Sequence, residues 1–347
     1  MKTVEKSRVE WIDIFKLLGI IAIFCGHLGY NTGGLHDFVF LYHVPLFFFA
    51  SGIFAYRLEE SDIWQAIKKK WKQIIMPYLF FAAISMVVII LTTNEDCRTY
   101  LGYAKQFVFG IRNQMYASSL WFLPCLFCMS ILFYIIRRIC KKRIFILIVS
   151  IALWLIASFV FPNRPDVTPS WIFNIDSACY YLIYYTAGYL LHEKLTEDCQ
   201  EVSKRKKVFV LIGSAILTGY VLLVYVQQDF IGTILCRNII GMQYVYPVLR
   251  TFLLILFNII LAKLMVNVGN MHKPGAQSLW MCGNEFIVKK IFDAIAGIAG
   301  FQININSALA AVLYAVVMVL FIYYVLMPFE QKIYQRLLEI IGLGKSQ

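Results

Sequence analysis

The chain has 347 residues, of which 60% are hydrophobic and only 15% are charged, and its mean hydropathy is +0.70. Soluble domains carry about a quarter charged residues, so this composition excludes an ordinary soluble protein. The apolar stretches are continuous, which argues against a β-barrel, because barrel strands alternate apolar and polar residues. The net charge of +12 comes from basic connecting segments, so no nucleic-acid partner is expected.

Taken in chain order, ten segments are apolar and long enough to cross a bilayer as helices. The sixth and ninth of them are short or interrupted by charges and the eighth contains an arginine, so a broken or re-entrant helix is an alternative there. The expected spans are 11–30, 38–56, 74–92, 119–136, 144–161, 177–192, 208–227, 247–266, 278–299 and 307–327.

Lysine and arginine concentrate in alternate connecting segments, namely those on the side of the N-terminus, such as 57–73, 137–143 and 193–207. Positive charge of this kind marks the cytoplasmic side of a membrane protein. The pattern therefore predicts an all-α, polytopic bundle of about ten spans with both termini in the cytoplasm. The connecting segments are short, so we expect one integral-membrane domain over residues 1–347.

The first expected span contains three ionisable residues, Asp13, Lys16 and His27. At about 100° per residue they share one stripe of a helix, and Asp13 and Lys16 are spaced to form an ion pair. Charges inside a span face the bundle interior or a wet cavity and indicate function. The helical rise leaves Lys16 near the cytoplasm and carries His27 about 24 Å from Trp11, into the outer half. A structural His27 and a Lys16 that extends to the surface are the alternatives.

Nine cysteines are scattered along the chain. Cys125 and Cys128 form one Cys-x-x-Cys pair inside an expected helix, without a second pair or nearby histidines, so no metal site is predicted. Cys25 lies two residues from His27 and faces another side of the helix, which argues against a thiol nucleophile activated by that imidazole.

Two stretches resemble the acyltransferase 3 family of integral-membrane acyltransferases. The first is Ile-Asp-x-x-Lys followed, ten residues later, by Gly-His, with Asp13, Lys16 and His27; the second is LYHVPLFFFASG at 41–52. The resemblance continues through KKWKQIIMPY at 69–78, SLWFLPCLF at 119–127 and the segment from Asp176 to Tyr189. Within that family the chain resembles the sugar O-acetylases typified by fucose 4-O-acetylase.

The resemblance implies transfer of an acetyl group from cytoplasmic acetyl-CoA to a hydroxyl of a cell-envelope or exported sugar, at a bacterial cytoplasmic membrane. The essential histidine of the family maps onto His27 and its first-span arginine onto Lys16. Its paired loop arginines map near Lys70 and Gln73, and Gln73 carries no charge. The segment 282–293 lacks the late histidine of the family.

These implications give each candidate residue a role. A neutral imidazole suits a general base, so His27 would take the proton of the sugar hydroxyl, beside Asp13 and Lys16. The CoA phosphates would contact Lys69, Lys70 and Lys72. The cations that could stabilise the oxyanion are Lys16, Arg250 and Lys289. His43 could contact the acceptor, orient His27 or be structural. Trp121 could also contact the acceptor, unless its ring belongs to an aromatic belt at the membrane interface.

Two other functions remain open from the sequence. One is a proton-coupled transporter or flippase for a polysaccharide precursor, with Asp13, Lys16 and His27 as a relay. The other is a non-catalytic membrane subunit. We expect a glycan or small sugar acceptor and membrane lipids as partners, and no metal.

Overall fold

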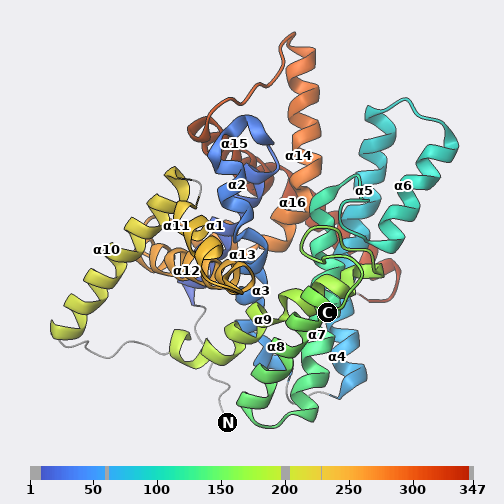
Figure 1. The fold of residues 1–347 in the computed structure, drawn as a ribbon. Coiled ribbons are helices and arrows are strands. Elements are labelled where there is room, and N and C mark those ends of the chain that lie inside the picture. The colour runs from blue at the N-terminus through green and yellow to red at the C-terminus, as the bar shows by residue number, and fades with distance from the viewer. Residues whose placement is uncertain (1–8, 59–61, 197–203, 228, 344–347) are drawn as a thin grey trace. The chain divides into compact units, whose positions relative to one another are not determined.

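The computed structural model describes residues 9–58, 62–196, 204–227 and 229–343. Within these ranges all regular secondary structure is helical, which confirms the all-α prediction (Figure 1). Each of the ten expected spans overlaps a helix. The chain ends lie outside the described residues, and the side of the membrane on which they lie stays a prediction.

Five helical segments of the described chain are long and apolar enough to cross a membrane, and a sixth would be formed by two helices that meet at 88°, Leu211–Val226 and Phe230–Asn238. The chain therefore has the character of a membrane protein, while the count of ten spans stays a prediction. The sixth, eighth and ninth expected spans are unbroken helices. The five segments are Gly34–Ile53, Ile63–Thr92, Ser118–Ile139, Met242–Leu264 and Ala308–Ile340.

The described chain forms two compact units. Unit 1 comprises residues 1–50, 191–278 and 305–315. Its central element is α1 (Glu10–Gly26), which packs against three other helices of this unit (Figure 1). These neighbours are α2 (Gly34–Phe40), α12 (Met242–Leu264) and α13 (His272–Ala276). The unit also contains the start of α3 (His43–Ile53), α10 (Lys204–Val226), α11 (Phe230–Asn238) and the first half of α15 (Ala308–Phe321).

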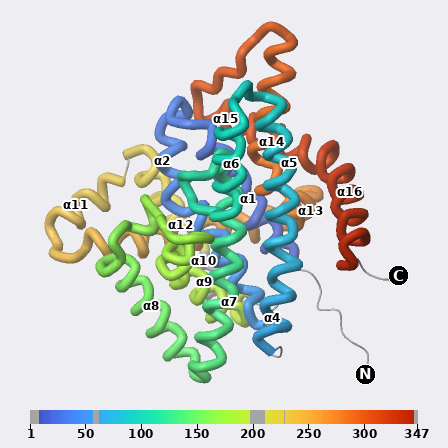
Figure 2. The backbone as a smooth tube through the Cα atoms, turned by 90° about the vertical axis from the view of Figure 1, so that its right-hand side faces the viewer, coloured from blue at the N-terminus to red at the C-terminus, as the bar shows by residue number. Residues whose placement is uncertain are grey.

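Unit 2 comprises residues 51–190, 279–304 and 316–347. In Figure 2 its helices α4 and α5 run on from one another, with α7 beside them. The helices of this unit are α4 (Ile63–Lys70), α5 (Met76–Thr92), α6 (Cys97–Phe109), α7 (Phe122–Ile139), α8 (Arg143–Phe159), most of α9 (Ile175–Thr196), nearly all of α14 (Ser278–Ile298) and α16 (Met327–Ile340).

Two π-helical turns interrupt the long helices of unit 2, at Trp71–Ile75 (η3) and Ile322–Leu326 (η6). Each is followed directly by a Met-Pro pair, containing Pro77 and Pro328. Proline has no backbone N–H and its ring collides with the carbonyl four residues earlier, so a regular α-turn fails at these points. Hydrogen bonds that reach five residues back widen the turn and let the helix continue.

Candidate functional site

The end of α1 places His27. The expected span ran to residue 30, but α1 ends at Gly26 and His27 is its C-cap. Helix α2 crosses at this point: a Cβ built on Gly26 would lie 3.0 Å from the Phe40 ring and 3.1 Å from Val39. Gly29 then turns the chain with φ 91°, a conformation that glycine adopts without strain. His27 is therefore presented at a helix end and not along a helix face.

A second imidazole lies beside it. The rings of His27 and His43 lie edge to face with their centroids 6.5 Å apart. His43 is buried, and its Nδ1 lies 2.7 Å from the carbonyl oxygen of Val39. A carbonyl only accepts hydrogen bonds, so Nδ1 is the donor, and in the neutral ring Nε2 carries the lone pair.

The chain around His43 is fixed from two sides. On α1, a Cβ on Gly19 would lie 2.7 Å from the Phe47 ring, so the absence of a side chain lets α3 pack closely. From α12, the Thr251 hydroxyl donates to the Leu41 carbonyl at 2.8 Å, and Asn258 hydrogen-bonds the Tyr42 hydroxyl. These contacts hold the turn between α2 and α3, and with it the His43 ring.

The predicted ion pair at the other end of α1 is present. Lys16 Nζ lies 2.7 Å from Asp13 Oδ1, and Asp13 is buried. The helical rise separates Lys16 from His27 by about 16 Å, so the structure does not bring this cation to the imidazole. Instead α13 packs on this end: a Cβ on Gly275 would lie 1.8 Å from the Asp13 carbonyl oxygen.

The other two candidate oxyanion cations have carboxylate partners. In unit 1, Arg250 Nη1 pairs with Asp229, which also accepts a hydrogen bond from the Tyr246 hydroxyl. In unit 2, Lys289 Nζ lies 3.1 Å from Glu285 Oε1 on the same helix. The charge of each cation is therefore partly neutralised by a neighbouring carboxylate.

The basic segment of unit 2 has two faces. Ala66 and Tyr134 are both buried and form a small core between α4 and α7. Lys70, one turn after Ala66, is half-buried, whereas Lys69 and Lys72 are exposed. The charges of Lys69 and Lys72 are therefore exposed on the surface, and Lys70 is the least exposed of the three lysines.

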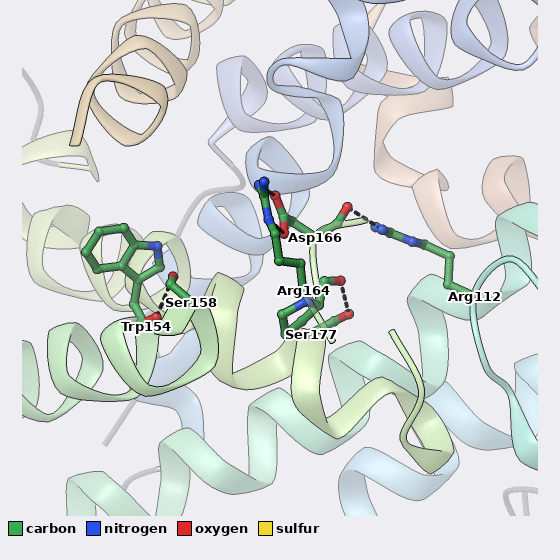
Figure 3. A network of polar contacts seen from close by, with 7 residues as sticks. Arg112, Trp154, Ser158, Arg164, Asp166 and Ser177 are labelled. Carbon is green, nitrogen blue, oxygen red and sulfur yellow. Dashed lines mark hydrogen bonds and ion pairs between the residues drawn. The ribbon is translucent and has the colours of Figure 1, made fainter. Parts of the chain in front are cut away.

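Trp121 is buried, and the guanidinium of Arg112 lies over its ring, 4.9 Å from the centroid. Arg112 also donates to the Asp166 carbonyl, and Figure 3 shows this contact beside the Arg164–Asp166 ion pair of 2.6 Å. The hydrogen bond and charge of Asp166 raise the pKa of Arg164. One face of the indole is therefore already occupied in this arrangement.

Asn174 joins the loops around Trp121. Its side chain is fully buried, accepts from the Arg112 backbone N–H at 2.8 Å and donates to the Gly110 carbonyl at 2.5 Å. Its φ of 53° lies in the left-handed region that asparagine tolerates better than most residues. Sequence reasoning missed this residue, because a single asparagine in a loop has no distinguishing spacing.

Residues 9–327 match the sequence model of the acyltransferase 3 family, which is described as an acyltransferase domain. The chain belongs to the acyltransferase 3 family. Comparison with curated proteins and with solved structures found no match. The match covers the ends of α1 and α3 that present His27 and His43, the basic turn and the Trp121 loops.

As a member of the acyltransferase 3 family, the protein is a membrane acyltransferase. The second imidazole, His43, lies inside the segment 41–52 that resembles the second span of the family. In the segment 282–293, which has no histidine, two buried polar side chains, Asn284 and Glu285, occupy α14. Asn284 donates to Glu330 Oε2 at 2.6 Å, so this part of the acyltransferase is hydrogen-bonded across unit 2.

Proposed function

We propose that this acyltransferase moves an acetyl group from cytoplasmic acetyl-CoA to a hydroxyl of a cell-envelope or exported sugar, in a bacterial cytoplasmic membrane. The observation that carries the proposal is the pair of imidazoles at the end of α1, with His43 held by the Val39 carbonyl. Hydroxyl groups are weak nucleophiles, and a positioned imidazole is the side chain most often used to activate them.

In this proposal His27 accepts the proton of the sugar hydroxyl while the oxygen attacks the thioester carbonyl. A tetrahedral oxyanion forms, its carbon–sulfur bond breaks, and CoA leaves as the thiol with the proton returned by the imidazole. His43 supports His27 by contacting the same hydroxyl or the sugar ring. A general base of this kind contributes about a hundredfold or more to the rate.

The donor is attracted by cations on the cytoplasmic side. Lys69, Lys70 and Lys72 attract the CoA phosphates as point charges. Lys70 is the least exposed of the three. Lys16 lies at the inner end of α1, where its charge is balanced by Asp13, so it contributes less to this attraction than the three loop lysines do. The acetyl group then crosses on the flexible pantetheine arm to the outer side, where His27 and the acceptor meet.

The test combines cells and purified protein. Envelope glycans from cells with and without the protein are compared by mass spectrometry, and a loss of acetyl groups with intact glycan is expected. Purified protein in nanodiscs should then transfer radiolabel from acetyl-CoA to glycan stripped of O-acetyl groups by mild alkali. Loss of exported glycan with unchanged acetylation would contradict the proposal and favour the transporter.

A further inference from the structure

A continuous row of tilted and edge-to-face ring contacts, called the stack below, leads from the surface of unit 1 to the two imidazoles. Tyr30 lies 4.1 Å from His36, His36 lies 4.5 Å from Phe40, and Phe40 lies 4.8 Å from His43, measured between ring centroids. His36 and Phe40 lie four residues apart on one face of α2, and His43 is the first residue of α3, after the turn at residues 41–42. The Phe40 ring also lies beside Gly26, the residue before His27, where a Cβ would stand 3.0 Å from it.

Two rings of the stack are exposed, the outermost one and the one next to His43. Tyr30 is 79% exposed and Phe40 is 48% exposed, although both are large aromatic residues. Asp37 adds an exposed carboxylate on the same helix, and its Oδ1 lies 2.9 Å from Nδ1 of His36. An exposed carboxylate is costly in a lipid-facing position, so this end of α2 faces water or the polar headgroups.

An aromatic belt at the membrane interface does not account for this arrangement. Belt residues are chiefly tryptophan and tyrosine distributed around the perimeter of a protein. Here a phenylalanine and a histidine, Phe40 and His36, belong to one row of contacting rings that ends at His43 and His27. The stack therefore connects the outside to the site proposed for proton transfer.

We propose that Tyr30, His36 and Phe40 form the binding platform for the sugar acceptor, with Asp37 accepting hydrogen bonds from sugar hydroxyls. This inference rests on the proposed function and names its acceptor subsite. A pyranose has an apolar C–H face that packs on aromatic rings and hydroxyls that donate to a carboxylate. A sugar lying on Phe40 brings its neighbouring hydroxyl to the imidazoles that flank this ring.

The test measures binding apart from catalysis. The probe is envelope glycan from cells lacking the protein, stripped of O-acetyl groups by mild alkali, and binding to protein in nanodiscs is followed by saturation-transfer difference NMR. Tyr30→Ala and Phe40→Leu should each weaken glycan binding, and together by about tenfold or more, on the scale of aromatic contacts. Asp37→Asn should weaken it as well.

Phe230→Ala is the matched control, because Phe230 is an aromatic residue of unit 1 outside the stack and its exposure, 55%, lies between those of Tyr30 and Phe40. It should bind as the unsubstituted protein does. Equal binding by the unsubstituted protein and the Tyr30 and Phe40 variants, or no binding by any of them, would overturn the platform. Radiolabel transfer is measured in parallel: glycan that binds through the stack but is never acetylated would overturn the proposed function alone.

In the transfer assay the two roles also separate. Platform variants should raise KM for the glycan while kcat and KM for acetyl-CoA stay within about twofold, because uniform binding is what they remove. A fall in kcat at unchanged KM for the glycan would assign Phe40 to the positioning of His43 and would contradict the platform.

Discussion

Gly275 of α13 lies directly against the main-chain carbonyl of Asp13 in α1. A Cβ on Gly275 would stand 1.8 Å from that oxygen, and the obstacle is backbone that cannot rotate away. The contact explains why the short helix α13 packs on the inner end of α1, and it makes the position sensitive to a single methyl group.

Gly275→Ala should therefore destabilise the protein by about 3 kcal/mol, the upper range for overpacking a close contact. Thermal unfolding in detergent measures this as a lowered Tm. Gly219→Ala is the control, because a Cβ on Gly219 of α10 would meet nothing within 4 Å. Equal melting of the two variants would show that α13 does not pack on Asp13 in solution.

His27→Ala should lower acetyl transfer by about a hundredfold or more, the scale of a lost general base, while insertion and acetyl-CoA binding stay nearly intact. His27→Gln keeps a hydrogen-bonding group but cannot take up a proton near neutral pH, so it should be almost as impaired. Initial rates with radiolabelled acetyl-CoA measure both. Wild-type turnover in the Gln variant would exclude His27 as the base.

Replacing Lys69, Lys70 and Lys72 together with glutamine should weaken acetyl-CoA binding and flatten its salt dependence, because attraction between exposed charges is screened by ions. Isothermal titration at several salt concentrations measures the change. The matched control is Lys141, Lys142 and Arg143 to glutamine, a second exposed basic cluster of unit 2 that loses the same charge. If both triple variants respond alike, the effect is one of net charge and the donor site lies elsewhere.

Membrane-impermeant thiol reagents should label Lys68→Cys and Arg164→Cys from opposite sides of the membrane, with Lys68 in the cytoplasm. Both side chains are exposed, and in the predicted topology the segments that carry them face opposite sides. The native cysteines that are not buried are first replaced with serine, namely the exposed Cys97 and the half-buried Cys128, Cys140 and Cys236, together with Cys199, which lies outside the described residues. Labelling of both positions from outside would refute the topology and the cytoplasmic donor together.

The helical class could be predicted from the sequence because runs of apolar residues with few charges are a strong and local signal. The Asp13–Lys16 pair could be predicted for the same reason, since residues three apart on a helix are neighbours whatever surrounds them. Local spacing carries this information without reference to the fold.

The end of α1 could not be predicted from spacing. The expected span ran to residue 30, whereas α1 stops at Gly26, where α2 packs against it and Gly29 takes a φ of 91°. The ion pair between Arg250 and Asp229 could not be predicted, because the two residues are distant in the sequence. The pair between Lys289 and Glu285 could have been predicted, because the two residues are four apart on one helix. The ring stack was missed because the expected second span began at residue 38, after His36.

The π-helical turn at Trp71–Ile75 alters what a fixed spacing means along the basic segment. In a regular α-helix, side chains three or four apart point the same way, but in a π-turn the main-chain bonds reach five residues back and each residue advances by a smaller angle. Gln73 is therefore rotated further from Lys70 than a helical wheel drawn through the segment implies. An arginine introduced at position 73 would therefore not lie beside Lys70, and the two charges would not bind one phosphate group together. The two charges would lie side by side only if one residue were removed from the π-turn. Their placement around the helix therefore depends on the number of residues in the turn as well as on residue type.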